Sequence, residues 1–400
     1  MTSTTTTTLS AGARTQRNQA AAYFTAFIAL GLVMSSLGPT LPGLAGNTRS
    51  TIGQISILFT AESLGVLIGN LLSGRWYDRA PAHPFLAAML LLIAAMLVLA
   101  PLASSLAVLA VIMGLIGLGA GSIDVGGNTL LIWVYREAVG PRMNALHFFF
   151  GLGALLAPIF VAQAIAITGD ISWAYWFLAL LVLPAVVMML RQPSPTAPVK
   201  TAGEATERPR WLLVVLLSAM FFLFVGAELS FGGWIYTYSI SLNLATVTTA
   251  GYLTSLYWAA LTLGRLISIP LAARVRPRYL LIADIAGMIF SLGLLLLFSR
   301  QPGVVWLAAF GMGFSMANVF PTLILLGGRH LPVTGNITSW YLVGGSLGSM
   351  LVPWLIGQRF ESIGPQVTMR IILLTVVLAG LVLAAFLVAI RPSRHDLVPK

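Results

Sequence analysis

The chain lacks cysteine entirely and contains few charged residues. Its 400 residues include no cysteine, 4 histidines and only 8% Asp, Glu, Lys and Arg. The absence of cysteine excludes disulfides, thiol nucleophiles and thiolate metal sites. Three of the four histidines, His83, His330 and His395, fall outside the predicted spans, so we expect no zinc or other metal site. A soluble domain carries about a quarter charged residues, and this composition therefore excludes an ordinary soluble protein.

Motifs of soluble enzymes are also missing. The sequence contains no G-x-x-x-x-G-K-[ST] phosphate loop and no H-E-x-x-H metal motif, and its serines and histidines show no nucleophile context. We therefore expect no enzymatic activity, no ATP-driven step and no bound cofactor. The first ten residues, MTSTTTTTLS, lack the basic end and short apolar core of a signal peptide, so the first hydrophobic segment is expected to be retained.

Long hydrophobic runs are what the chain has in abundance. Hydrophobic residues make up 58% of the sequence, and the mean hydropathy is +0.93. A helix needs about 20 apolar residues to cross a bilayer. The sequence therefore predicts an all-α polytopic membrane protein that crosses the lipid bilayer twelve times, over residues 20–46, 51–74, 84–103, 106–132, 142–167, 172–190, 211–239, 247–273, 279–299, 303–327, 334–358 and 368–390.

A polar segment divides the spans into two groups of six. Residues 191–210, RQPSPTAPVKTAGEATERPR, are rich in proline, threonine and charge, as is typical of a flexible linker. The predicted domains are a tail (1–19), an amino-terminal six-helix bundle (20–190), this linker (191–210), a carboxy-terminal six-helix bundle (211–390) and a second tail (391–400).

The basic residues predict the orientation. The pI of about 10.5 would suit nucleic-acid binding, but the positive charges are spread through short loops, so no nucleic-acid partner is expected. With the amino terminus in the cytoplasm, most of the 22 lysines and arginines fall inside. Arg49, Arg300, Arg359 and Arg370 fall outside, and Arg265 lies within a span. We expect a multi-pass protein of the plasma (inner) membrane with both termini cytoplasmic.

The two halves repeat one another. A shift of 195 residues places MNALHFFFGLGALLAPIFVAQ from Met143 on TSWYLVGGSLGSMLVPWLIGQ from Thr338. A shift of 194 pairs the fourth span with the tenth, and Asp124 then meets Asn318 while Asn128 meets Thr322. Two similar six-span halves in the same orientation are typical of transporters whose substrate site lies between the halves.

The polar centre of the fourth span is GLGAGSIDVGGNTLL, residues 117–131. Asp124 and Asn128 are four residues apart and therefore share one helix face, and small residues crowd the same turns. A carboxylate costs several kcal/mol at this depth, so it is expected to face a cavity or a partner. Two interpretations remain: a site for substrate or coupling ion at the membrane midplane, or polar contacts that hold helices together.

Several segments carry a more specific resemblance. The loop Gly74-Arg-Trp-Tyr-Asp78-Arg79 resembles the G-x-x-x-D-R signature of the major facilitator superfamily, although Pro81, Ala82 and His83 replace its usual tail. The segments IDVGGNTLLIW, NALHFFFGLGALLAP and VGAELSFGGWIYTY are similar to the sodium-dependent glucose transporters and their fucose–proton symporter relatives. The resemblance covers nearly the whole chain.

The resemblance implies two pseudo-symmetric six-helix bundles and a secondary active transporter. Its expected substrate is a small polar solute, most simply a monosaccharide, moved with sodium or a proton by a monomer. The fucose symporters carry an acid and an amide at the spacing of Asp124 and Asn128, but they also use an acid in the first helix, where this chain has only Ser35 and Ser36 as nearby polar candidates. The alternative is proton-coupled efflux of drugs or lipids, for which the glycine pattern after Gly153 is degraded.

The candidate residues combine these two lines of reasoning. Glu228 precedes an aromatic stretch and two glycines, Gly232 and Gly233, that are able to break the helix. Tyr236 and Tyr238 suit either a sugar or an interfacial aromatic belt. Glu62 lines a wall or pairs with a hydroxyl or Arg265, and His147 is a pH-sensitive gate or a packing residue. The predicted substrate contacts are Asp124, Asn128, Glu228, Trp234, Tyr236, Tyr238, Asn318, Thr322, Tyr257, Trp258 and His147. The predicted cation ligands are Asp124, Glu228 and Glu62, and the predicted cytoplasmic gate is Asp78, Arg79 and Arg136.

Overall fold

The computed structural model describes residues 3–77, 80–196, 210–272, 274–298, 301–331 and 335–390. These residues form helices and short connections, with no strand among them. The amino-terminal half contains α1 (Ser3–Met34), α2 (Leu37–Thr48), α3 (Ile52–Ile55), α4 (Ile57–Tyr77), α5 (Ala82–Leu99), η1 (Ala100–Leu102), α6 (Leu106–Tyr135), η2 (Arg136–Val139), α7 (Gly140–Thr168) and α8 (Ile171–Leu190). The carboxy-terminal half contains α9 (Trp211–Ser241), α10 (Val247–Ala272), α11 (Pro277–Leu297), α12 (Pro302–Met316), α13 (Val319–Gly328), α14 (Gly335–Ile363) and α15 (Val367–Ala389).

Each of the twelve predicted spans coincides with one helix or with two consecutive helices. Within the described ranges, nine stretches are long and apolar enough to cross a membrane, or ten when the bent pair α1–α2 is included. One of these stretches, Leu106–Thr168, contains both α6 and α7. Separating those two helices and adding α10, which has 26 residues, gives the twelve crossings. Residues 197–209 of the predicted linker and the tail 391–400 lie outside the described residues.

Three predicted spans are interrupted where the sequence predicted continuous helices, and the second of them is interrupted at the single residue Ser56, between α3 and α4. The first span bends by 47° between α1 and α2, at Ser35 and Ser36. The tenth is interrupted at Ala317 and Asn318, between α12 and α13. Gly232 and Gly233, which are able to break a helix, do not do so here, because α9 is continuous from Trp211 to Ser241. These glycines instead allow close packing: a Cβ atom at Gly38 would lie 2.7 Å from the Gly233 carbonyl oxygen.

Glycines bring helix backbones into contact at equivalent places in the two halves. A Cβ atom at Gly117 of α6 would lie 2.0 Å from the Glu62 carbonyl oxygen of α4. A Cβ atom at Gly313 of α12 would lie 2.2 Å from the carbonyl oxygen of Tyr257 of α10. The packing thus aligns Gly117 with Gly313, a shift of 196 (313 minus 117), rather than with Gly311 as the predicted shift of 194 had it.

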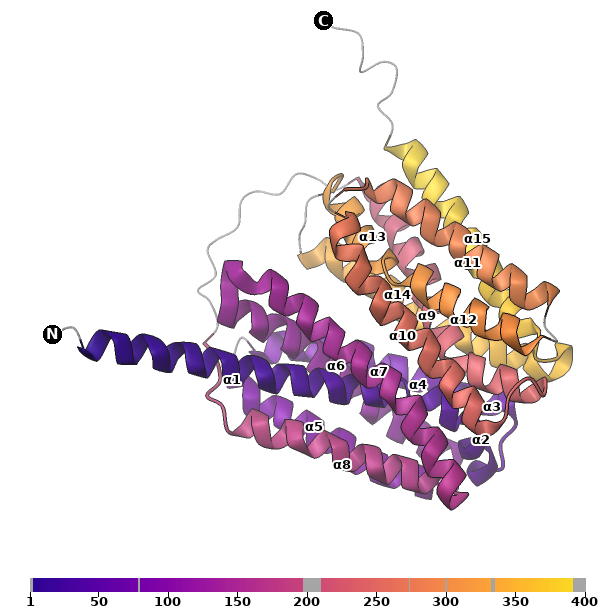
Figure 1. Ribbon diagram of the computed structural model, residues 1–400, viewed down its shortest axis with the longest axis horizontal. Helices are drawn as coiled ribbons and strands as arrows, with labels where there is room; N and C mark the ends of the chain where they lie inside the picture. Colours follow the sequence, from indigo (N-terminus) through magenta and orange to yellow (C-terminus); the bar gives the residue numbers. More distant parts are fainter. Residues whose placement is uncertain are drawn as a thin grey trace, which may run out of the picture.

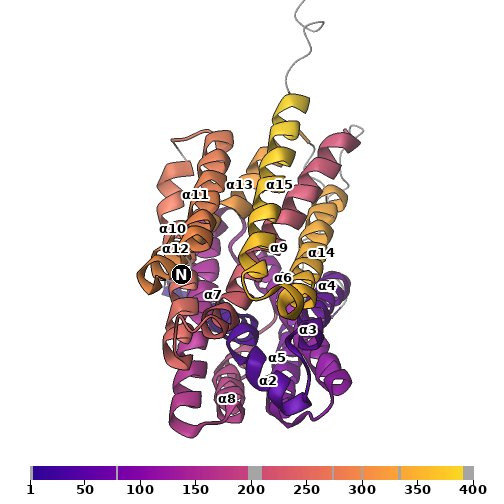
Figure 2. The same cartoon turned by 90° about the vertical axis from the view of Figure 1, so that its right-hand side faces the viewer.

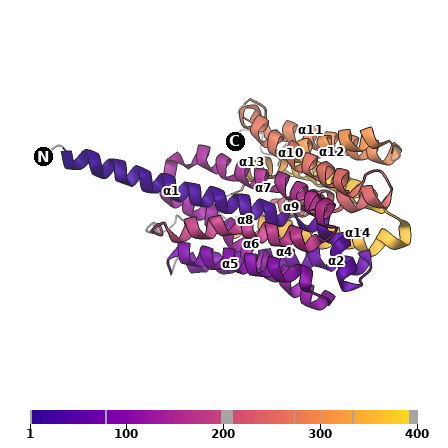
Figure 3. The same cartoon turned by 60° about the horizontal axis from the view of Figure 1, so that its bottom comes forward.

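The halves meet along two helix pairs and diverge from one another elsewhere (Figure 1). The pairs are α4 with α14 and α7 with α10, and α2 also packs on α9. Inside each half the main packing partners are again related by the repeat, because α4 packs on α6 as α10 packs on α12. The amino-terminal part of α1 extends well past the rest of the bundle (Figure 3).

The hydrogen bonds between the halves gather at one end of the molecule. The Ile52 amide donates to Glu361 Oε1 at 2.9 Å, Gln358 Nε2 donates to the Gly53 carbonyl at 2.7 Å, and Ser56 Oγ donates to the Trp354 carbonyl at 3.4 Å. Gln163 of α7 and Tyr252 of α10 pair at the same end. Among the described residues, the halves are therefore closed on each other where α2 joins α3 and α14 ends.

The glycine contact between α4 and α6 predicts a sign difference between two alanine substitutions. Alanine in a helix interior is more favourable than glycine by about 0.5–1 kcal/mol. Gly293→Ala in α11, where an added Cβ meets nothing within 4 Å, is expected to leave the apparent Tm unchanged or higher. Gly117→Ala is expected to lower it, because the Glu62 carbonyl leaves no room for the methyl group. Equal shifts for the two variants in a detergent melting assay would contradict this packing.

The closed end predicts that Gln358→Ala/Glu361→Ala opens the molecule there. Spin labels on cysteines at Gly46 of α2 and Ile363 of α14 would report the separation of the halves, and the chain has no native cysteine to interfere. In double electron–electron resonance, we expect the double variant to show an added population with a longer distance between the two labels. Ser362→Ala is the control, because its hydroxyl bonds only locally, to the Arg359 carbonyl. An unchanged distance distribution in the double variant would exclude a role for these bonds in closure.

Candidate functional site

A pocket lies between the halves, next to the closed end. It is lined by Met34, Ser35, Leu37, Gly38, Phe59, Glu62, Ser63, Leu229, Gly232, Gly233, Trp258 and Ser349. Its cavity volume is about 30 Å³, which leaves room for only a few water molecules. Helices α1, α2 and α4 of one half and α9, α10 and α14 of the other contribute to its wall, and the close contact of Gly38 with Gly233 forms part of it. The bend at Ser35 thus lies at the pocket.

Glu62 is the carboxylate of this pocket. Its side chain is 6% exposed, and no described residue forms a hydrogen bond or an ion pair with it. The hydroxyls of Ser35, Ser63 and Ser349 line the same pocket. Of the alternatives for Glu62, pairing with Arg265 was wrong, because Arg265 lies beside Glu228 instead. A carboxylate in the span region that faces a pocket without a partner is able to accept a cation or a hydroxyl donor.

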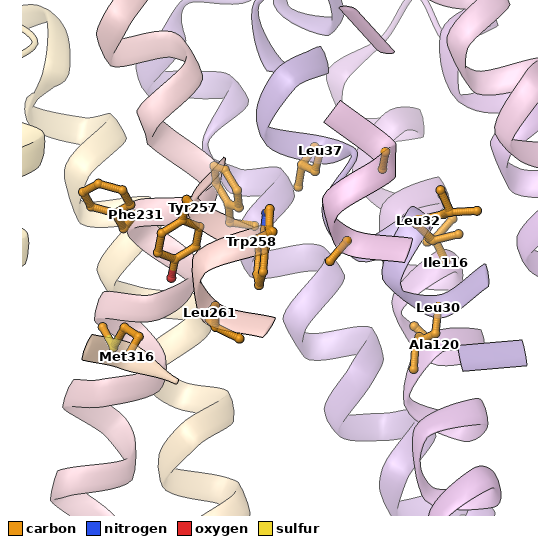
Figure 4. Packing of buried hydrophobic residues seen from close by; sticks show 14 of the residues in the cluster. Leu30, Leu32, Leu37, Ile116, Ala120, Phe231, Tyr257, Trp258, Leu261 and Met316 are labelled. Atoms are coloured by element: carbon orange, nitrogen blue, oxygen red, sulfur yellow. The ribbon is translucent and has the colours of Figure 1, made fainter. Parts of the chain in front are cut away.

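Trp258 and Tyr257 stand side by side on α10. Trp258 lines the pocket, and its indole N–H is buried without an acceptor in the described structure. Tyr257 is fully buried behind it, against Phe231, and donates from its hydroxyl to the Glu228 carbonyl oxygen at 3.0 Å. Figure 4 shows both rings on the side that holds Phe231 and Met316, with Leu37 on the other side. Trp258 therefore offers a ligand a ring and a free donor, whereas Tyr257 positions α9.

Glu228 forms an ion pair within the carboxy-terminal half. Its Oε1 lies 3.6 Å from a guanidinium nitrogen of Arg265, and the two side chains are 16% and 28% exposed. His147 of α7 is half-buried, and its ring meets that of Phe27 at nearly a right angle, with the centroids 6.0 Å apart. The structure therefore pairs a carboxylate of α9 with a guanidinium of α10. Glu228 and His147 were candidates from sequence, whereas Arg265 was not among the predicted site residues.

Asp124 and Asn128 are half-buried on α6 and bonded to each other. Asn128 Nδ2 donates to Asp124 Oδ1 at 3.1 Å and to the Asp124 carbonyl at 2.9 Å. They share a helix face with Gly117, which touches the Glu62 backbone. Asp124 lies seven residues further on, so it sits about 10 Å along α6 from the level of Glu62. Asp124 and Glu228 do not line the pocket that Glu62 lines.

Three predicted aromatic contacts lie in packed surroundings. Trp234 is fully buried between Phe59 and Phe360, and its indole N–H donates to the Pro353 carbonyl at 3.2 Å. Tyr236 and Tyr238 are 3% and 0% exposed, so neither forms the solvent-facing belt that was the alternative. None of the three lines the pocket, and the geometry gives their predicted contact with substrate no support. Packing against α14 explains this for Trp234, which contacts Pro353 and Phe360, whereas Tyr236 is buried about 200° around α9 from it, on another face.

The remaining candidates lie elsewhere. Asn318 and Thr322 are buried at the α12–α13 break, where the Thr322 amide donates to the Asn318 carbonyl at 3.1 Å. Neither lines the pocket. Of the predicted gate, Asp78 and Arg79 lie outside the described residues. Arg136 is exposed and ends α6 with a φ of 48°.

Two features of the site were missed from sequence. A charged residue inside a predicted span should have a partner, so Arg265 and Glu228 were the simplest pair to propose across adjacent spans. The bend at Ser35 and Ser36 had only a weak signal, two adjacent serines whose hydroxyls bond to backbone carbonyls of the preceding turn.

Comparison with known proteins agrees with this architecture. The family model of the Major Facilitator Superfamily matches residues 23–353. Sodium-dependent glucose transporter 1A of Mus musculus is 28% identical in an alignment of 376 positions that covers 84% of this chain and 88% of the mouse protein. Major facilitator superfamily domain-containing protein 4A of Homo sapiens is 25% identical in an alignment of 443 positions that covers 86% of each chain.

Solved structures show the same fold. The crystal structure of a mutant of the nucleoside transporter NupG superposes with a TM-score of 0.74 at 13% identity, covering 94% of this chain and all of that one. A likeness at this identity concerns the fold alone. The twelve spans, the repeated halves and the family match lead to one conclusion: the chain is a multi-pass membrane transporter that belongs to the Major Facilitator Superfamily.

Proposed function

We propose that this transporter moves a monosaccharide together with sodium or a proton, and that Glu62 is the carboxylate that binds the cation. One observation carries the proposal: a carboxylate without a partner among the described residues lines a pocket between the two halves. Substrate sites of transporters built from two repeats lie at this interface. The relatives named sodium-dependent glucose transporter 1 supply the substrate class and the cation.

The groups that line the pocket suit a small polyhydroxylated solute, and the cavity of about 30 Å³ must widen to admit one. The Trp258 indole offers a face for the C–H surface of a sugar ring, and its N–H is a buried donor that a sugar hydroxyl would satisfy. Serine hydroxyls of three helices offer further partners to the sugar or to a sodium ion. Nothing in the lining is positively charged, so an anionic substrate would find no counter-charge there.

Coupling follows from the cost of a bare carboxylate. A charged Glu62 is expensive to enclose between two apolar half-bundles, whereas Glu62 with a bound sodium ion or proton is not. The cation therefore changes the relative stability of the closed states, which is the requirement for coupled movement. Asp124 and Glu228 remain the second and third proposed cation ligands. We further propose a monomer in the plasma (inner) membrane with both termini in the cytoplasm, so that the closed end is the outer one.

The proposal predicts that Glu62→Gln uncouples transport. In proteoliposomes, the variant is expected to lose accumulation of labelled D-glucose driven by a sodium or pH gradient by at least tenfold. It is expected to keep counterflow exchange, because exchange does not need the gradient. Glu137→Gln, an exposed acid of η2, is the control and should accumulate normally. Unchanged accumulation by Glu62→Gln would contradict the proposed role of Glu62. Tighter binding of hydrophobic compounds than of any hexose would favour the alternative function, efflux.

The ion pair predicts a separate result for Glu228. Removing one partner of a buried pair leaves an unpaired charge and costs about 3–5 kcal/mol, so Glu228→Gln is expected to lower the apparent Tm. Glu228→Gln/Arg265→Gln removes both charges and is expected to restore it. If this stable double variant still accumulates sugar, Glu228 is structural and not a cation ligand. If the double variant keeps counterflow exchange but no longer accumulates sugar in a gradient, Glu228 shares the cation with Glu62. An unchanged Tm in Glu228→Gln would contradict the pairing itself.

A further inference from the structure

A second pocket lies at the other end of the carboxy-terminal half, away from the site between the halves. The start of α11, the end of α13 and the end of α15 form its wall. The lining residues are Arg276, Pro277, Arg278, Tyr279, Ile282, Leu326, Arg329, His330, Leu387 and Ile390. Its empty space, including the mouth, is about 1280 Å³. In Figure 2, α13 and the upper ends of α11 and α15 lie together at this end.

The polar part of the pocket is strongly positive. Three arginines and a histidine line it, and no acidic side chain does. No described carboxylate forms an ion pair with Arg276, Arg278 or Arg329. Arg278 instead stacks on the Tyr279 ring at 4.7 Å and donates to its hydroxyl at 2.9 Å. Guanidinium groups that line one pocket favour an anion between them, and the group that they bind best in two-point geometry is a phosphate or carboxylate.

The apolar part of the pocket continues onto the membrane-facing side of the helices. Tyr279 and Ile282 are 53% and 48% exposed, and Phe290, two turns further along α11, is 67% exposed. Leu326 and Leu387 line the pocket next to the charges. In a chain that crosses the bilayer, apolar side chains exposed in this way face lipid tails. The pocket therefore presents positive charge at the membrane surface and an apolar wall just below it.

We propose that this pocket binds an anionic phospholipid, with the headgroup phosphate against Arg276, Arg278 and Arg329. The first carbons of one acyl chain would lie along Ile282 and Leu387. A free phosphate shares the charge complementarity but leaves the apolar wall unused, which is why the lipid is the better fit. One lipid held in this way joins the ends of α11, α13 and α15, and so stabilises the half that contains the broken tenth span. The site is independent of the substrate pocket.

Native mass spectrometry tests the proposal on the purified full-length protein. With phosphatidylglycerol and phosphatidylcholine at equal concentration, we expect a retained phosphatidylglycerol adduct and a higher apparent Tm with that lipid alone. Arg276→Gln/Arg329→Gln is expected to reduce the adduct at least fivefold and to abolish the Tm increase. The matched control is Arg274→Gln/Arg370→Gln, which removes the same charge from exposed positions that do not line the pocket. The control is expected to behave as the unmodified protein does.

Three outcomes would overturn the proposal. Equal loss of lipid in the control would mean that bulk charge, and not this pocket, attracts the lipid. A Tm increase with inorganic phosphate or glycerol 3-phosphate that matches the lipid, and that the pocket variant loses, would identify a soluble phosphate ligand. An unchanged adduct in the pocket variant would exclude the site. Arg276→Lys/Arg329→Lys guards against misfolding, because it keeps the charge and should retain part of the adduct.

Discussion

The cost of placing a carboxylate among apolar helices organises the interior of this transporter. Three acids lie deep in the spans, and each is accommodated differently. Glu228 has an ion pair with Arg265, Asp124 has the amide of Asn128 one turn away, and Glu62 has a pocket. A paired carboxylate needs nothing further to be stable, whereas an unpaired one requires a ligand or a proton when water leaves. The difference between these environments is the reason that Glu62 is our first proposed cation ligand, ahead of Asp124 and Glu228.

The repeat explains the scaffold but not the site. Gly117 and Gly313 make the same backbone contact in the two halves, so the repeat preserves the close packing of α6 on α4 and of α12 on α10. At the position equivalent to Glu62 the second half has Tyr257, which bonds to the backbone of α9. The breaks are also unequal: the first span bends and its counterpart α9 is continuous, while α6 is continuous and its counterpart is broken at Asn318. The proposed cation ligand therefore stands at a position where the two halves carry different residues, Glu62 and Tyr257.

Sequence alone predicted the parts of the structure that depend on hydrophobic length. All twelve spans were located within a few residues, because a bilayer demands a fixed apolar length regardless of tertiary contacts. The breaks could not be predicted in the same way. Ser35 and Ser36 are compatible with a continuous helix, and Gly232 and Gly233 with a broken one, so the outcome depends on what packs against them. Trp234 shows the same limit: its type suits a sugar site, but its burial between Phe59 and Phe360 follows from the α9–α14 contact.

The position of the pocket relative to the closed end has a mechanical consequence. Gly38, Gly233 and Phe59 both line the pocket and form the contact that seals it on that side. The hydrogen bonds beyond them, from Ile52 to Glu361 and from Gln358 to Gly53, must break before the opposite state forms. Each bond contributes about 1 kcal/mol net, so the closed end is held by an energy comparable to the differential affinity of one ligand for two states. Phe59 and Glu62 lie one turn apart on α4, so the proposed cation ligand and the seal belong to the same helix.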